Sequence, residues 1–497
     1  MRSSLAIAVA LMLVLAGCSQ APGGATTTAA DTTQPESGVE TTTVDTESAV
    51  VAPDDPDTDV LGWEDGRWYN ETINVTPSDG LNDTELDAVV SRSMARVERI
   101  RGLEFDERVP VEIQTREEFR AEQRRGSGSE KRRTFDNAKF EALFMINEST
   151  DSLAIQRRNS GSSVGGYYSP TDEEIVVISD NVSTPQLDEI TLSQELFHAL
   201  QDQQFDISSY NQSTRELHNA NDGLIEGDGN YVDYLYEQRC RDEWDGDCLF
   251  PQSPPGGGAE LANIGPYLLR FQPYSDGPAF VRGVQRRGGW TAVNDLYENP
   301  PASTEQVIHP DKYGDDEPAA FAIEGASDDD WSRLRLDGRP DYASVGEAGL
   351  FSMFMYPVYA SEGQTQIVPA QSFFNRGEDG EIDQFDPYDY NSTYSDGWDG
   401  DKLAVYTSES AAENETGYVW KTVWDSEDDA AEFVEGYRQL LRANNATAVD
   451  GRTNTWRIEG EFADAFHVDR DGETVVVTNA PTVADLGDVR EGAAPEQ

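Results

Sequence analysis

Apolar and polar positions along the chain predict an alternation of helices and strands. Residues 83–101 have helical spacing, and the segment 109–114, Val-Pro-Val-Glu-Ile-Gln, is typical of a strand. A hairpin is expected next, with strands at 164–168 and 175–178 on either side of a turn at 169–172. Three strand segments therefore follow the first helix.

The best-marked helix follows this hairpin. We expect Thr184 to cap it and Pro185 to occupy its first turn. The apolar residues that then recur at helical spacing are Leu187, Ile190, Phe197 and Leu200. Gln194 and His198 therefore share one face of the helix, with Glu195 beside them. A second helix, expected at 217–239, carries Glu226.

The remaining pattern predicts a change of architecture towards the C-terminus. Helices are expected at 277–287 and 344–356, the latter opening with Ser344 and Glu347 as a capping-box pair. The last third gives a β-β-α-β-β order, with segments at 403–406, 417–420, 430–441, 454–459 and 474–478. We therefore expect an α+β fold, with a larger domain at 59–360 and a smaller α+β region at 361–497.

The N-terminal segment indicates export. A basic start precedes an apolar run from Leu5 to Ala16, which is too short to span a bilayer and is typical of a signal peptide. The run ends in Leu-Ala-Gly-Cys, so residues 1–18 look like a lipoprotein signal with Cys18 as the lipidation site. The alternative is an ordinary secretory signal with an incidental cysteine. Residues 19–58 are rich in Thr, Ser and acidic residues and are expected to form a solvated stalk.

Composition narrows the environment and the partners. The formal net charge is −57, and Asp and Glu together number 94 against 37 Lys and Arg. Such a chain repels itself in dilute buffer, and molar salt screens that repulsion. The charge favours a salt-adapted, halophilic protein and excludes nucleic acid as a partner. We expect the protein on the extracellular face of the membrane, held by lipid.

Export also bears on cysteines and sequons. With Cys18 lipidated, Cys240 and Cys248 remain in an oxidising compartment and are expected to form a disulfide. Nine Asn-x-Ser/Thr sequons make N-glycosylation plausible. They begin at Asn70, Asn74, Asn82, Asn147, Asn181, Asn211, Asn391, Asn414 and Asn445.

Residues 194–198 read Gln-Glu-Leu-Phe-His, which differs at its first position from the zinc motif His-Glu-x-x-His. In that motif two histidines one turn apart bind zinc, and the Glu is the general base. Gln194 stands at the first ligand position, His198 at the second and Glu195 at the base. Glu226, in the glycine-rich run 223–229, is the candidate third ligand, because small residues let two helices approach closely.

Residues 192–203 and the Glu226 segment resemble the gluzincin-type zinc metallopeptidases. They are similar in particular to exported archaeal and bacterial relatives whose helix reads His-Glu-Leu-x-His-Ala-Leu-Gln-Asp-Gln. The runs at 288–290, 300–310 and 397–401 are also similar to segments of such surface proteins, so the resemblance covers roughly residues 160–410. The resemblance is close to a subgroup of halophilic archaeal surface lipoproteins of unknown function. It implies a zincin-like domain in which substrate lies along an edge strand before the motif helix.

Gln194 leaves two functions open. An amide oxygen is neutral and binds zinc more weakly than imidazole, and without zinc Glu195 has no acidified water to deprotonate. We therefore expect a lipid-anchored surface protein on a gluzincin-like scaffold with a degenerate metal site. Its role would be envelope structure or the binding of a peptide or surface protein. The alternative is an active extracellular zinc metallopeptidase that uses Gln194, His198 and Glu226.

Other residues admit a chemical and a structural interpretation. His309 either is structural or lines the cleft as the proton donor or oxyanion partner that gluzincins often carry. His218 is expected at the surface, with a substitute ligand role as the alternative. His467 is expected at the surface of a strand. Asp399 and Asp401 are expected in a plain turn, with a Ca²⁺ site as the alternative.

Overall fold

The computed structural model describes residues 55–76, 79–125, 129–179, 181–244, 248–250, 261–323, 330–377, 379–383, 385–408 and 415–496. The predicted signal peptide, Cys18 and the predicted stalk as far as residue 54 lie outside this part. The fold is α+β, as predicted. No helix among the described residues combines the length and the apolar character needed to cross a bilayer.

The helices and strands are as follows. The helices are α1 (Asp83–Arg101), α2 (Arg116–Arg125), α3 (Glu130–Ala142), α4 (Ser152–Ser163), α5 (Glu189–Phe205), α6 (Arg215–Asp242), α7 (Ile264–Glu298), α8 (Thr304–Ile308), α9 (Gly346–Ala360), α10 (Glu427–Ala443) and α11 (Asp485–Val489). The strands are β1 (Trp63–Glu64), β2 (Arg67–Trp68), β3 (Val111–Gln114), β4 (Gly166–Ser169), β5 (Glu174–Ile178), β6 (Trp331–Arg333), β7 (Trp398–Ser408), β8 (Gly417–Trp424), β9 (Thr447–Ala448), β10 (Thr455–Arg457), β11 (Ala465–Asp471) and β12 (Thr474–Ala480).

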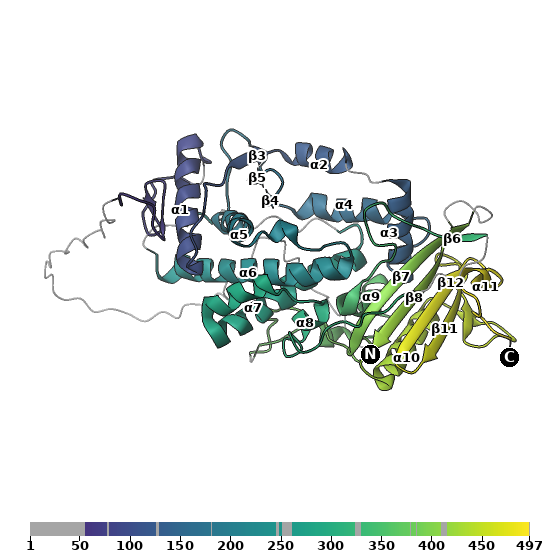
Figure 1. Cartoon of the computed structure of the whole chain (residues 1–497). Coiled ribbons are helices and arrows are strands. Elements are labelled where there is room, and N and C mark those ends of the chain that lie inside the picture. Colours follow the sequence, from purple (N-terminus) through teal and green to yellow (C-terminus); the bar gives the residue numbers. More distant parts are fainter. Residues whose placement is uncertain are drawn as a thin grey trace, which may run out of the picture.

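The N-terminal part joins helices to a small sheet. This sheet has the order β3-β5-β4, with β3 parallel and β4 antiparallel to β5, so β4 is an edge strand. Helix α5 lies against β4 and β5, and α6 crosses the length of this part (Figure 1). The predicted hairpin and both motif helices are therefore present, with the hairpin next to the helix that carries Gln194.

Helix α5 begins later than the sequence predicted. Asp188, not Thr184, is its N-cap. The segment before it is held by other backbone contacts: the Leu81 amide donates to the Pro185 carbonyl, and Gly80 lies directly against Thr184. The helix starts where Glu189 enters a buried network.

That network is ionic. The Glu189 carboxylate pairs with Arg92 at 3.0 Å and Arg96 at 2.6 Å, all three buried, and it accepts hydrogen bonds from the Tyr236 hydroxyl and the Leu249 amide. The predicted disulfide between Cys240 and Cys248 is formed beside it. The disulfide ties the end of α6 to the segment that donates to Glu189.

Helices α6 and α7 approach each other through glycines. A Cβ atom added at Gly227 would lie 2.6 Å from the Gly277 carbonyl oxygen, and one at Gly277 would lie 2.6 Å from the Gly223 carbonyl oxygen. Helix α7 begins earlier than the predicted 277–287, since it runs through Pro273 and Pro278, and its helical geometry is interrupted at Gly289 (φ 70°), close to the predicted end. Packing against α6 outweighs the helix-breaking tendency of these prolines.

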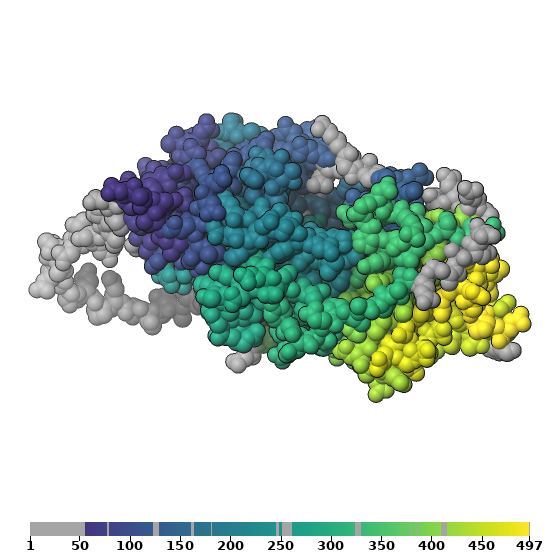
Figure 2. Space-filling model, viewed as in Figure 1, coloured from purple at the N-terminus to yellow at the C-terminus, as the bar shows by residue number. Residues whose placement is uncertain are grey.

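The C-terminal part is a seven-stranded sheet in the order β6-β7-β8-β12-β11-β10-β9, antiparallel throughout. Phe433 of α10 packs against Trp420 and Trp424 of β8. The sequence pattern predicted no bounds for β11, although it placed His467 in a strand. The second half of β11, Asp469-Arg470-Asp471, is charged and exposed. In Figure 1 the sheet stands at one end of the molecule, and Figure 2 shows it continuous with the helical part.

The domain boundary expected at 360/361 stays a prediction, and packing contacts extend across it. Strand β6 pairs with β7, and α9 shares a hydrophobic core with the sheet and α10. The predicted capping box of α9 is not formed. Asp401, which lies in β7 rather than in a turn, accepts hydrogen bonds from the Val345 and Gly346 amides at 3.0 Å each. A residue distant in sequence thus caps the helix.

Candidate functional site

Helices α5 and α6 bring together the motif residues. His198 Nε2 lies 3.4 Å from Glu226 Oε2. Gln194 is one turn earlier on the same face as His198 and is 3% exposed. Gly229 leaves room for the His198 ring, because a Cβ atom at position 229 would lie 3.2 Å from the ring carbon Cε1. The small residues around Glu226 thus admit α5 on one side and α7 on the other.

A buried network orients the His198 ring. His198 Nδ1 lies 2.7 Å from Gln201 Oε1, and Gln201 Nε2 donates to the Ile225 carbonyl and to the Tyr297 hydroxyl. Because the Gln201 amide nitrogen is committed to those acceptors, its oxygen faces His198 and accepts from Nδ1–H. Tyr297 in turn donates to Asp228, which pairs with Arg101 at 3.0 Å. Residues of four helices, α1, α5, α6 and α7, therefore take part in fixing the ring.

Glu195 faces the edge strand. Its Oε2 accepts a hydrogen bond of 2.9 Å from the backbone amide of Tyr168 in β4. The Tyr168 hydroxyl donates to Asp202 on the same helix as Glu195. The carboxylate therefore lies between the edge strand and the His198–Glu226 pair.

Charges at this site are mutually dependent. Burial raises the pKa of Glu195 to about 7, with His198 lowering it and Glu226 raising it. Burial lowers the pKa of His198, but the carboxylates of Glu226 and Glu195 outweigh burial and raise it to about 10. Burial raises the pKa of Glu226, and the cationic His198 outweighs this and brings it below its ordinary value. Around neutral pH, His198 and Glu226 are therefore an ion pair.

Only part of this donor set fits zinc. Two ligands at 2.0–2.1 Å from a tetrahedral ion lie about 3.4 Å apart, which is the separation of His198 Nε2 and Glu226 Oε2. The hydrogen bond at Nδ1 is also of the kind that orients a ligand imidazole. The Gln194 amide supplies neither the charge of a carboxylate nor the affinity of imidazole. The set thus does not fit a zinc site with three strong ligands.

The other predicted residues lie elsewhere. His309 follows α8, and its Nε2 lies 3.1 Å from Glu347 Oε1 and 3.7 Å from Asp396 Oδ1. His218 pairs with Asp222 on α6 at 3.4 Å. His467 is buried in β11, contrary to the surface position expected, because its ring lies 3.2 Å from the Thr453 carbonyl at the turn before β10.

The sequons differ in accessibility, and their glycosylation stays a prediction. Asn414 lies outside the described residues, and Asn70 and Asn147 are half-buried. The exposed sequon residues are Asn74, Asn82, Asn181, Asn211, Asn391 and Asn445. The Asn82 side chain already caps α1 by accepting from the amides of Thr84 and Glu85.

Sequence reasoning missed the residues that support the site. Tyr274, on α7, donates a hydrogen bond of 2.8 Å to Glu226 Oε1. Gln201 could have been found, because it follows His198 by three residues on the same helix. Tyr274 and Tyr297 could not, since their helix was expected only at 277–287 and its approach to α6 depends on the fold.

Comparisons with known proteins give one match. Residues 332–490 match the model of a domain of unknown function, DUF8575. This segment begins in β6 and ends just after α11, so it covers most of the C-terminal sheet unit and leaves α5 and α6 outside. The comparisons with curated proteins and with solved structures find no match.

Proposed function

We propose that this chain is a surface protein, lipid-anchored at Cys18, that uses a gluzincin-like scaffold for binding a peptide or surface protein, or for envelope structure. The observation that carries the proposal is the pairing of His198 with Glu226 beside Gln194. This pairing neutralises two buried groups without a metal. A zinc ion would have to displace the proton on His198. The weak interaction of zinc with the Gln194 amide would offset little of that cost.

The loss of zinc would also remove the task of Glu195. A peptidase base acts on water that the metal has made acidic, and an ordinary water is a far weaker acid. The ion pair and the Gln201 network would then serve to fix α5 against α6. Apart from the Tyr168 amide, which donates to Glu195, the edge strand β4 would offer its outer side to an extended peptide that adds to the sheet.

A second function, that of an active zinc metallopeptidase, has one observation in its favour. The pKa of Glu195 is raised by burial to about 7, which is where a general base works best. In this alternative, Gln194, His198 and Glu226 would hold zinc and Glu195 would activate water.

Metal content and peptidase activity separate the two functions. We expect the full chain, purified in molar salt, to bind no zinc that depends on His198 and to leave peptides intact. The variants to compare are His198→Ala, Glu195→Gln and, as a control histidine on α6, His218→Ala. Stoichiometric zinc lost only in His198→Ala, together with peptide hydrolysis lost in Glu195→Gln, would overturn the proposal in favour of the peptidase.

Anchoring is tested separately. Cys18→Ser removes the thioether site, so the protein should move from the membrane fraction to the medium or stay unprocessed. Cys240→Ser with Cys248→Ser is the control, because it removes cysteines without touching the signal. A Cys18→Ser protein that matures and fractionates like the wild type would show that Cys18 is not the anchor.

A further inference from the structure

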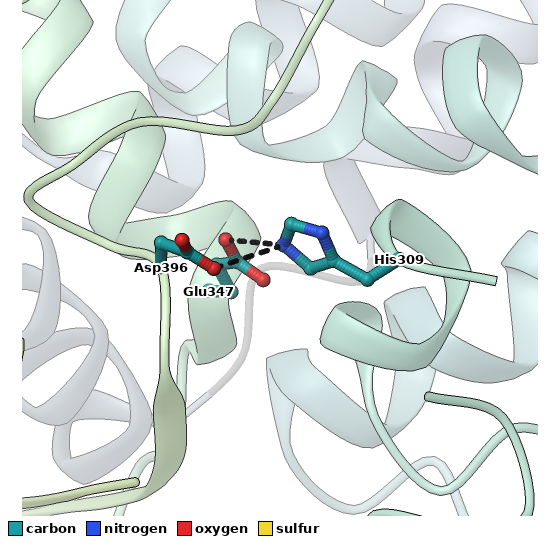
Figure 3. Close-up of side chains that lie close together, drawn as sticks. All are labelled: His309, Glu347 and Asp396. Carbon is teal, nitrogen blue, oxygen red and sulfur yellow. Dashed lines mark hydrogen bonds and ion pairs between the residues drawn. The ribbon is translucent and has the colours of Figure 1, made fainter. Parts of the chain in front are cut away.

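We propose that His309, Glu347 and Asp396 form a binding site for a divalent transition-metal ion such as Zn²⁺, separate from the Gln194 site. Three segments meet there: His309 directly follows α8, Glu347 is in the first turn of α9, and Asp396 precedes β7. Figure 3 shows both carboxylates turned towards the same ring nitrogen of His309.

The spacing of the donor atoms suits one ion. His309 Nε2 lies 3.1 Å from Glu347 Oε1 and 3.7 Å from Asp396 Oδ1, and all three donor atoms lie within 4.8 Å of one another. Ligands at 2.0–2.2 Å from one metal ion lie about 3.0–3.6 Å apart at angles of 90–110°. Small side-chain rotations would therefore complete the coordination.

Glu347 supplies an independent indication. Its side chain is fully buried, at 0% exposure, yet Oε2 has no hydrogen-bond partner within the described part of the chain. A buried carboxylate oxygen without a partner is costly, and a coordinated cation would satisfy it. Asp396 is 55% exposed, so the site has an entry from solvent and room for water ligands.

A neighbouring cluster of three carboxylates is occupied by a lysine of the same chain. Glu305, Asp316 and Asp425 surround Lys312 Nζ at 2.6, 3.0 and 2.7 Å, so a side-chain ammonium already occupies their centre. The His309 cluster has an imidazole instead, which is itself a metal ligand.

The donor types select the class of ion. One imidazole and two carboxylates favour zinc and similar transition metals over Ca²⁺ and Mg²⁺, which prefer oxygen ligands. Three protein ligands leave at least one position for water. Because His309 lies outside residues 332–490 while Glu347 and Asp396 lie inside, the ion would fasten the helical part to the C-terminal unit.

Calorimetric titration of Zn²⁺ into the chelator-treated full chain in molar KCl tests the site. We expect one tight site in the wild type, weakened about 10- to 100-fold or more in His309→Gln, Glu347→Gln and Asp396→Asn. Zinc should also raise the Tm of the wild type more than that of the three variants. Asp396→Asn is the decisive variant, because its exposed side chain can change without harm to folding.

Two controls separate this site from others. His218→Gln removes a histidine that also faces a carboxylate, and His198→Gln removes the histidine of the Gln194 site; neither should alter the affinity for zinc. The proposal is overturned if the wild type shows no tight site, or if Asp396→Asn binds as the wild type does. It is also overturned if binding is lost in His198→Gln and kept in His309→Gln, a result that would count against the proposed function as well.

Discussion

His198 is the residue whose state decides the chemistry of the candidate site. Both ring nitrogens are engaged, Nδ1 with Gln201 and Nε2 with Glu226. A third donor at position 194 would compete with the proton on Nε2 by offering the ion a full set of ligands. The side chain at position 194 therefore decides whether His198 and Glu226 form an ion pair or part of a metal site.

Gln194→His should consequently create tight zinc binding. The new imidazole would stand one turn from His198 and complete a set of two imidazoles and one carboxylate with an open position. Zinc titration of the variant should show a site that the wild type lacks, with peptidase activity a weaker expectation, since groups around the ligands have their own requirements.

The control for this variant is Gln204→His, which adds a histidine to the same helix nearly three turns further on. A gain in affinity shared by both variants would reflect a surface histidine, and no gain in Gln194→His would show that the resemblance stops at the helix. Both should be measured in a His309→Gln background, which removes the other proposed site.

A second residue-scale prediction concerns Glu64 and Glu98. Burial raises the pKa of Glu64 to about 9 and that of Glu98 to about 7, and the protonated Glu64 donates to the Glu98 carboxylate. The folded state thus keeps a proton that the unfolded chain loses near pH 4.5. Stability contributed by this proton falls as pH rises from about 4.5 towards 9.

Glu64→Gln should remove much of that loss, because an amide donates to Glu98 without ionising. Melting curves between pH 5 and pH 9 should fall less steeply for the variant than for the wild type, and the two should converge at the acidic end. Asp65→Asn, at the exposed neighbouring position, should change the slope much less, because Asp65 is the weakest of the neighbouring charges that raise the pKa of Glu64. Parallel wild-type and Glu64→Gln curves would mean that Glu64 is ionised in the folded protein.

The sequence predicted the residues of the α5–α6 site but not their supports. Helical periodicity places Gln194, Glu195 and His198 correctly, since it depends only on local spacing. The pairing of His309 with Glu347 and Asp396 joins segments that are far apart in sequence, so no local pattern indicates it. The only member of this cluster singled out for chemistry from the sequence was His309.

At the scale of elements, helices α6 and α7 approach each other backbone to backbone at Gly227 and Gly277. Gly227→Ala would push a methyl group into the Gly277 carbonyl, and because both partners are backbone neither can rotate away. We expect a loss of about 1–3 kcal/mol in the free energy of unfolding, measured by denaturation in high salt.

Gly283→Ala on α7 is the matched control. The nearest atom to an added Cβ there is the flexible Arg287 guanidinium at 3.5 Å, so the change should be neutral or stabilising by up to about 1 kcal/mol. Equal effects of the two substitutions would show that helix propensity, not the α6–α7 approach, governs Gly227.

Element boundaries were predicted best where the cap is local. Helix α1 runs over the predicted 83–101, because Asn82 and Glu85 form a capping box within the segment itself. Helix α9 departs from the prediction because the Ser344 hydroxyl donates to Asp401, which also accepts from the Val345 and Gly346 amides. Helix α7 departs because its contacts with α6 override its prolines. In both helices, contacts with residues distant in sequence shift the boundary away from the predicted one.

At the scale of the whole molecule, two kinds of charge must be distinguished. The buried pairs of Arg92 and Arg96 with Glu189, and of Arg101 with Asp228, are compensated and shielded from solvent. The formal net charge of −57 therefore resides largely in solvated acidic residues, which repel one another across the surface. Salt screens the repulsion between solvated acidic residues far more than the attraction within the buried ion pairs.

Dialysis from molar salt into dilute buffer should consequently loosen the fold while leaving its buried pairs intact until it opens. At about 1 M salt the Debye length is near 3 Å, shorter than most distances between surface charges, and at 0.1 M it is near 10 Å. Far-UV circular dichroism and melting curves should show the Tm falling below roughly 1 M. The same recovery on adding KCl or NaCl would identify screening as the cause, whereas recovery with only one salt would indicate specific ion binding. A spectrum and Tm unchanged in low salt would show that the packing of the helical part and the C-terminal sheet withstands the full surface repulsion.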